Sequence, residues 1–253
     1  MGFYDLSAFE RAQKANDIYI AVRNDLKTNS YNRIINYFGD ADTYIRKNAY
    51  LAVGKIYNQH PELKVEILNC LNTLLPYAHY HVRQTVINAA GEIGKYNFTI
   101  TEHFFDTGLF DPHHTVRNAV IGSIKKMGEK NPQPILQWAR KYLHHPDKEI
   151  RREICHGIEL RGRTHPQDVL PLLKELQFDN TSRVLKTLVH VIGQIAYKKG
   201  CLATVICELN QWENRTLVKA AIKEIIDVHY RYRNFSVLNQ QEAIAYIEAN
   251  ALP

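Results

Sequence analysis

The stretch Asp111-Pro-His-His-Thr-Val-Arg117 decides the fold, because its pattern returns along the chain: a polar turn, an aliphatic residue, usually a base, and an apolar helical face. The other copies read Asp40-Ala-Asp-Thr-Tyr-Ile-Arg46, Tyr77-Ala-His-Tyr-His-Val-Arg83, His145-Pro-Asp-Lys-Glu-Ile-Arg151, Asp179-Asn-Thr-Ser-Arg-Val-Leu185 and Glu213-Asn-Arg-Thr-Leu-Val-Lys219. Their last residues are spaced by 37 residues once and by 34 residues thereafter. A fixed period of this length is typical of repeat proteins.

The residues around each turn predict two helices per repeat. Three residues after the turn come Ala49, Val86, Val120, Ile154, Leu188 and Ile222, and seven residues after it come Val53, Ala90, Ile124, Ile158, Ile192 and Ile226. These positions form one face of a helix with a period near 3.6 residues. A second apolar periodic stretch precedes the turns, for example at 61–71, 134–143 and 169–176. Because one helical hairpin cannot cover its own apolar face, the pattern predicts an all-α fold in which hairpins stack into an α-solenoid.

The second helix of several repeats resembles that of HEAT-like, or armadillo-type, repeats. Val82-Arg83 is followed by Gly91-Glu-Ile-Gly94, and Val184-Leu185 by Gly193-Gln-Ile195, whereas the tetratricopeptide and ankyrin patterns are missing. The resemblance implies a right-handed superhelix with a concave face. We therefore expect one repeat domain over 1–253, with an N-terminal cap at 1–30 (one helix at 3–26), repeats at 31–232 and a C-terminal cap at 233–253.

The composition favours a folded protein outside the membrane. Hydrophobic residues make up 45% of the 253 residues and charged residues 23%, so a sizeable core can form. No segment approaches the roughly 18 apolar residues of a membrane span, and the first residues lack a signal-peptide pattern. We expect a cytoplasmic protein that does not bind membranes, with its four cysteines as reduced core thiols.

The net charge of +6 is concentrated in the middle of the chain. Residues 117–163 hold eleven Lys and Arg but five Asp and Glu, which accounts for the whole excess. Part of it has a structural explanation, because the recurrent bases Arg46, Arg83, Arg117 and Arg151 can pair with Asp residues of neighbouring turns and form a ladder between repeats. The remaining bases favour an acidic partner.

The residue after each turn pattern should face the inner surface that second helices line in this fold. This column reads Lys47, Gln84, Asn118, Arg152, Lys186 and Ala220, and the next turn of the same face adds Leu51, Asn88, Gly122, His156, His190 and Glu224. Basic and amide side chains of this kind suit a phosphate backbone. We predict nucleic-acid contacts by Arg152 and Lys186 first, then by Lys47, Lys125 and Lys126, with Asn118, Gln84, His156 and His190 beside them.

One central segment resembles a family of repeat proteins that act on DNA. Residues 130–152 contain a Lys-x-Pro turn, a helix with Trp138 and the pair Arg151-Arg152, as in the AlkD-type DNA alkylation repair proteins. Residues 237–247 resemble the C-terminal helix of that family. The resemblance implies a HEAT-like solenoid that binds DNA in a basic concave groove, with Arg152 at the DNA-facing site.

The chain departs from that family at the catalytic position. The glycosylases carry an essential Asp in a Trp-Asp segment one repeat before the Arg, whereas this chain has His113-His-Thr-Val-Arg117 there. A cationic Arg would repel the developing positive charge of the sugar, which a carboxylate stabilises. We therefore predict no catalytic residue and interpret the chain as a DNA-binding relative of the repair proteins that does not excise bases.

Two alternatives and two expected absences complete the interpretation. HEAT-like arrays also serve as protein-interaction scaffolds, and a glycosylase could use a displaced carboxylate at Glu92, Glu159 or Glu224. The twelve histidines include His113-His114 and His144-His145, but no His-Glu-x-x-His or Cys-x-x-Cys spacing occurs. We therefore expect neither a metal nor a small-molecule cofactor.

Overall fold

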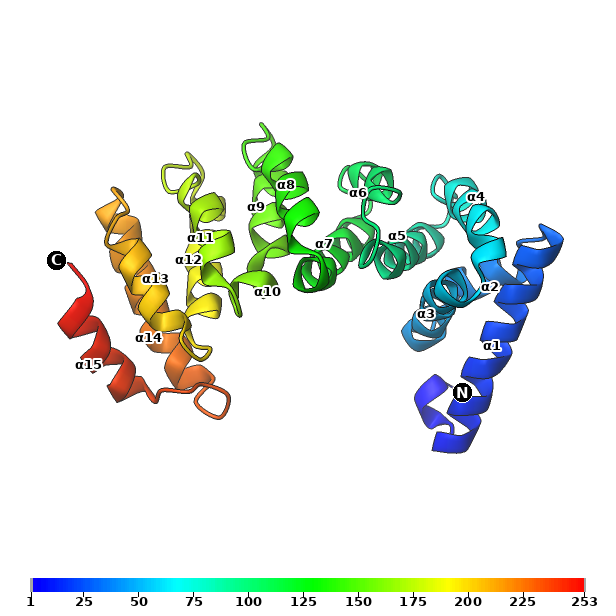
Figure 1. Ribbon diagram of the computed structural model, residues 1–253, viewed down its shortest axis with the longest axis horizontal. Helices are drawn as coiled ribbons and strands as arrows, with labels where there is room; N and C mark the ends of the chain where they lie inside the picture. Colours follow the sequence, from blue (N-terminus) through cyan, green and yellow to red (C-terminus); the bar gives the residue numbers. More distant parts are fainter. Residues whose placement is uncertain (1, 253) are drawn as a thin grey trace. The chain divides into compact units, whose positions relative to one another are not determined.

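The protein is all-α, as predicted, in the computed structural model, which describes residues 2–252 (Figure 1). Short loops join the helices, and no strand occurs among the described residues. Backbone contacts divide the chain into two compact units between Ser123 and Ile124, inside helix α7 (His114–Lys130). Each unit is described by itself below. The single domain with terminal caps, whose predicted ends include residues 1 and 253 outside the described range, stays a prediction.

The first unit contains stacked helical hairpins and the first part of α7. Its helices are α1 (Ala8–Thr28), α2 (Asn32–Gly39), α3 (Thr43–Gln59), α4 (Lys64–Leu74), α5 (Tyr80–Gly94) and α6 (Glu102–Gly108). The most extensive contacts between helices join α1 to α3 and α3 to α5. Large side chains such as Phe38, Phe104 and Phe105 fill the space between the helices and are fully buried.

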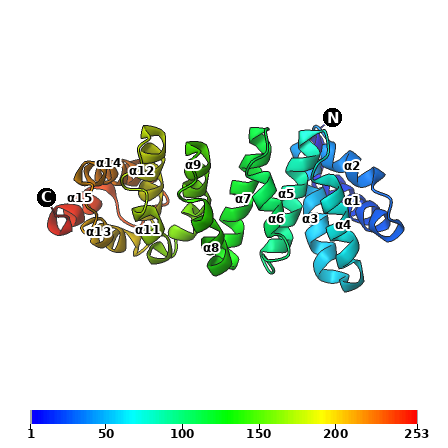
Figure 2. The same cartoon turned by 90° about the horizontal axis from the view of Figure 1, so that it is seen from above.

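The second unit repeats this arrangement. Its helices are α8 (Pro132–Tyr142), α9 (Lys148–Gly157), α10 (Glu159–Gly162), α11 (Pro166–Lys174), α12 (Ser182–Ala196), α13 (Cys201–Leu209), α14 (Arg215–Arg231) and α15 (Gln240–Asn250). The second helices α9, α12 and α14 lie side by side in chain order (Figure 2). Trp138 and Trp212 are buried in this unit. The stacking in both units confirms the predicted α-solenoid class.

The 34-residue pattern sets the register of the second helices. The positions three residues after the turns are buried at Ala49, Val86, Val120, Ile154 and Leu188, as predicted. Ile222 is only half-buried, because α14 is followed only by the short helix α15. Turn residues also start the helices: Asp147 accepts a hydrogen bond from the Glu149 backbone N–H at the start of α9, and Pro residues begin α8 and α11.

The ends of the chain and one cysteine differ from the sequence interpretation. The helix predicted at 3–26 is instead a short 3₁₀ turn followed by α1 from Ala8, because Ser7 caps α1 in a capping box with Glu10. Cys207 is exposed and is not a core thiol, whereas the other three cysteines are buried. Within residues 2–252, no helix combines the length and the apolar character that crossing a membrane requires.

Two of the predicted ladder arginines, Arg83 in the first unit and Arg151 in the second, bind an Asp of the next turn, and Arg117 donates to carbonyls of its own turn. Arg83 binds the carboxylate of Asp111 through Nε at 2.7 Å and Nη2 at 3.0 Å, and Arg151 binds Asp179 at 2.6 and 3.1 Å. Each arginine also donates Nη1 to two backbone carbonyls of its own turn. Each pair therefore ties one repeat to the turn of the next. Arg46 makes only the bonds within its own turn and no ion pair among the described residues.

Candidate functional site

The inner column of the first unit is polar but electrically balanced. Lys47 and Asn118 are exposed and Gln84 is half-buried, as expected for side chains that point away from the core. Residues 1–123 hold twelve bases and twelve acids. The one inner carboxylate, Glu92, lies 2.5 Å from the Lys95 ammonium. This unit therefore carries no excess charge to attract a polyanion.

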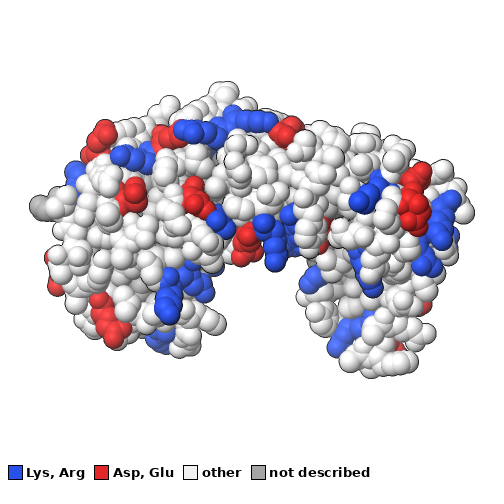
Figure 3. All heavy atoms as spheres, viewed as in Figure 1, with Lys and Arg blue, Asp and Glu red and all other residues white. Residues whose placement is uncertain are grey.

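The second unit carries the whole net charge. Residues 124–253 hold twenty bases and fourteen acids. In Figure 3, blue Lys and Arg atoms gather on the underside of this unit, with red Asp and Glu atoms directly beside them. The basic excess is therefore interrupted by carboxylates, and the partners of each predicted residue decide what it can bind.

Arg152, the first predicted phosphate contact, is already paired within the protein. Its Nε lies 2.9 Å from Glu149 Oε2 and its Nη2 lies 3.6 Å from Oε1 of the buried Glu153. Glu149 is shared with Arg183, whose Nε lies 2.8 Å from Oε1. Arg152 is half-buried, so its charge reaches a ligand only if the ligand competes with these carboxylates.

The predicted lysines divide into two kinds. Lys126 and Lys186 are exposed, and Lys186 lies at the rim of an apolar groove between α12 and α14 that contains Leu185, Val189 and Leu217. Lys125 instead turns toward the protein, where its Nζ donates to Glu159 Oε2 at 3.2 Å. Lys186 is therefore better placed for a ligand than Arg152 or Lys125, whose charged groups pair with carboxylates.

Glu159, at the start of α10, is the centre of a polar cluster in the second unit. Its side chain is only 4% exposed, and Arg163 Nη2 lies 2.5 Å from Oε1 while Lys125 Nζ and His156 Nδ1 approach Oε2 at 3.2 and 3.5 Å. Burial by itself raises the pKa of Glu159, but the His156 hydrogen bond and the charges of Lys125 and Arg163 outweigh it and lower the pKa to about 2. The carboxylate is ionised at neutral pH.

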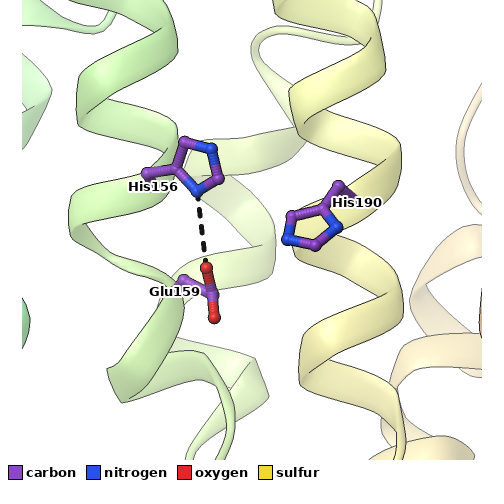
Figure 4. Close-up of side chains that lie close together, drawn as sticks. All are labelled: His156, Glu159 and His190. Carbon is purple, nitrogen blue, oxygen red and sulfur yellow. Dashed lines mark hydrogen bonds and ion pairs between the residues drawn. The ribbon is translucent and has the colours of Figure 1, made fainter. Parts of the chain in front are cut away.

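Two predicted inner residues, His156 and His190, flank Glu159 (Figure 4). The imidazole rings come from α9 and α12, and their centroids lie 5.7 Å apart in an edge-to-face arrangement. His190 Nδ1 lies 3.6 Å from Glu224 Oε1, and Glu224 in turn binds Arg231 at 2.5 Å. Arg163 continues the network by donating to Gln194 Oε1 at 2.8 Å.

The structure thus brings together His156, His190 and Lys125 but leaves Arg152 and Lys186 outside their cluster. The sequence interpretation gave Glu159 only as an alternative glycosylase carboxylate and did not connect it to its neighbours. A usable signal was present, because 34 residues separate Lys125 from Glu159, His156 from His190 and His190 from Glu224. Residues one period apart occupy the same position in neighbouring repeats, where second helices pack side by side.

Comparison with known proteins gives only distant structural likenesses. No family model and no curated protein matches the chain. Among solved structures, YibA of E. coli is 16% identical with a TM-score of 0.41 over 96% of this chain and 88% of its own. A designed armadillo repeat protein for modular peptide recognition is 18% identical with a TM-score of 0.33, over 78% of this chain and 98% of its own. The CpcE–CpcF complex of phycocyanin lyase from Nostoc sp. PCC7120 is 15% identical with a TM-score of 0.36, over 98% and 92%.

Scores this low carry no inference about function. The assignment of the fold rests on the stacked helical hairpins and on the 34-residue register of their second helices.

Proposed function

We propose that this helical-repeat scaffold binds nucleic acid, most favourably double-stranded or branched DNA, through the inner face of its second unit. The observation that carries the proposal is the division of charge: residues 124–253 have a net charge of +6, whereas residues 1–123 are neutral. A positive field confined to one unit concentrates a polyanion there, and each phosphate neutralised releases counterions into solution.

The exposed lysines are the proposed primary contacts. Lys186 is exposed in the second unit and is the first of these contacts, Lys126 is also exposed there, and Lys47 offers a further contact in the first unit. Arg152 binds after the lysines, because a phosphate must first displace the Glu149 carboxylate from it. Glu149 also pairs with Arg183. Asn118, Gln84, His156 and His190 would add hydrogen bonds, and Lys125 would contribute after it leaves Glu159.

Kinship with the AlkD-type repair proteins is part of this proposal, and base excision is not. The support is the segment 130–152, with its Trp138 and Arg151-Arg152. Glu159 argues against a displaced catalytic carboxylate, since it is 4% exposed and Lys125 and Arg163 already neutralise it. A catalytic carboxylate must instead face the sugar whose positive charge it stabilises.

A salt titration tests the proposal. We expect a mobility shift of duplex DNA at low salt, and with roughly four phosphate contacts the logarithm of affinity should fall against the logarithm of salt with a slope of about −3.6. The variant Lys186→Glu should weaken binding and make the slope less negative by about 1 to 2. The matched control is Lys14→Glu, an exposed lysine on α1 of the neutral unit, which should bind like the parent. Absence of a shift at low salt, or a flat salt response, would refute nucleic-acid binding.

A protein-binding role is the second candidate, favoured by the apolar groove between α12 and α14. Leu185, Val189, Leu217 and Ala220 line it with little polar surface. A protein partner should remain bound after nuclease treatment. Leu185→Asp should then abolish this binding, and Lys186→Glu should weaken it less. If instead Lys186→Glu weakens the binding of DNA more than Leu185→Asp does, the result supports nucleic-acid binding.

A further inference from the structure

We propose, against the sequence-based expectation of no metal, that His156, Glu159 and His190 form a binding site for a divalent transition-metal ion of the zinc class. One ligand atom from each residue lies within 4.8 Å of the other two. Ligand atoms on opposite sides of one zinc ion are at most about 4.2 Å apart, because zinc–nitrogen and zinc–oxygen bonds measure about 2.1 Å. Small rotations of the two rings therefore close the site.

The carboxylate is fixed in place before any ion arrives. Arg163 holds Glu159 by Oε1, so the ligand atom is Oε2, which lies on the side of His156. Figure 4 shows the His156 ring above this oxygen and the His190 ring to its right, one from α9 and the other from α12. The two imidazoles are 28% and 43% exposed, whereas Glu159 is 4% exposed. An ion can therefore enter from solvent and meet a preorganised buried anion.

Glu224 orients the imidazole of His190 from the side opposite Glu159. It lies 3.6 Å from His190 Nδ1, so the other ring nitrogen, Nε2, is turned toward Glu159 (Figure 4). Arg231 fixes Glu224 at 2.5 Å. A carboxylate on the distal nitrogen of a ligating histidine is the usual outer support of metal sites, because it sets the tautomer and the ring orientation.

Lys125 competes with the ion for the same oxygen. Its ammonium lies 3.2 Å from Glu159 Oε2, so a bound cation must displace it. The Lys125 side chain is 29% exposed and its aliphatic stem is flexible, so it can turn into solvent. Arg163 remains on Oε1 and lowers the affinity through its charge. Removal of the Lys125 ammonium should consequently tighten metal binding.

The chemistry of the donors selects the ion. Two imidazoles and one carboxylate suit Zn²⁺, Co²⁺ and Ni²⁺, whereas Mg²⁺ and Ca²⁺ require mainly oxygen ligands. Three protein ligands leave a fourth tetrahedral position for water.

Calorimetric titration with Zn²⁺ of the full chain, stripped of metal by a chelator, tests the site. We expect one ion per chain and, with Co²⁺, visible absorption bands of nitrogen and oxygen coordination. His156→Ala and His190→Ala should each weaken Zn²⁺ binding at least about 100-fold, and Glu224→Gln about 10- to 100-fold as a positioning residue. Lys125→Met should strengthen it. His144→Ala is the matched control, because His144 lies in the same unit, is exposed and contacts only Glu175 among the ion pairs of the described residues.

The outcomes separate this site from other binding. Equal Zn²⁺ affinity in the parent and in His190→Ala would overturn the proposal, as would affinity lost equally in His144→Ala, which indicates surface histidines. Circular dichroism of the His156→Ala and His190→Ala chains establishes that they fold, which is expected because both rings are partly exposed. None of these measurements involves nucleic acid, so they can refute the metal site without affecting the proposal of DNA binding.

Discussion

Two regions of the second unit use charged side chains in opposite ways: the turn edge and the cluster around Glu159. At the turn edge, Arg151 binds Asp179 and two carbonyls of its own turn, and Arg83 binds Asp111 with the same geometry in the first unit. In the cluster, Lys125, His156 and Arg163 all contact the buried carboxylate of Glu159. The first arrangement recurs, whereas the second has no counterpart one or two periods later among the described residues, because Gly193 has no side chain to offer and Asp227 is exposed.

The comparison separates what a repeat fold requires from what it merely permits. A turn arginine donates to carbonyls of its own turn, and it also binds the next turn where that turn begins with Asp, as it does for Arg83 and Arg151. A buried carboxylate on the inner face has no such general purpose. It brings a desolvation cost that only specific partners offset, so it can occur only where a repeat supplies those partners.

The largest expected effect on stability lies at the turn edge. Arg151→Met should lower the free energy of unfolding by about 3 to 5 kcal/mol, because it leaves Asp179, whose side chain is only 3% exposed, as an unpaired buried anion. Urea unfolding monitored by circular dichroism measures the change. The double variant Arg151→Met/Asp179→Asn should recover part of the loss, and no recovery would contradict a role for the ion pair.

A smaller effect, dependent on pH, is expected in the cluster. Glu159→Gln should cost about 3 kcal/mol at pH 7, because the pKa of Glu159 falls from 4.5 to about 2 on folding. The folded-state pKa is lowered, so the advantage of the parent over the variant is complete above pH 4.5 and declines as the pH falls toward 2. Urea midpoints of both proteins across this range check the prediction. A difference that stays constant down to pH 2 would show that the ionised carboxylate is not its source.

The sequence predicted the turn edge better than the cluster for a physical reason. The repeated spacing named Arg46, Arg83, Arg117 and Arg151 as ladder residues. Arg83 and Arg151 bind Asp111 and Asp179 of the next turns, whereas Arg46 does not, because the turn after it begins with Tyr77. The cluster depends on which side chains of neighbouring repeats converge, and His156 was predicted as a separate phosphate contact. Pairing residues 34 positions apart would have connected it to His190. The approach of Arg163 could not be found in this way, because it depends on α10 turning away from α9 at Gly157 and Ile158.

The smallest effect should come from the turn arginine that lacks an aspartate. Arg46 donates to the carbonyls of Asp40 and Ala41 and to the Thr43 hydroxyl, and burial lowers its pKa despite the charge of Asp40. Arg46→Met should therefore cost about 1.5 to 3 kcal/mol, the value of hydrogen bonds that involve one charged group. Because Arg151 makes the same carbonyl contacts, the difference between the two Met variants in urea unfolding isolates the Asp179 carboxylate. Equal losses in both would mean that the carbonyl bonds alone hold the turns, and the ladder between repeats would then contribute nothing to stability.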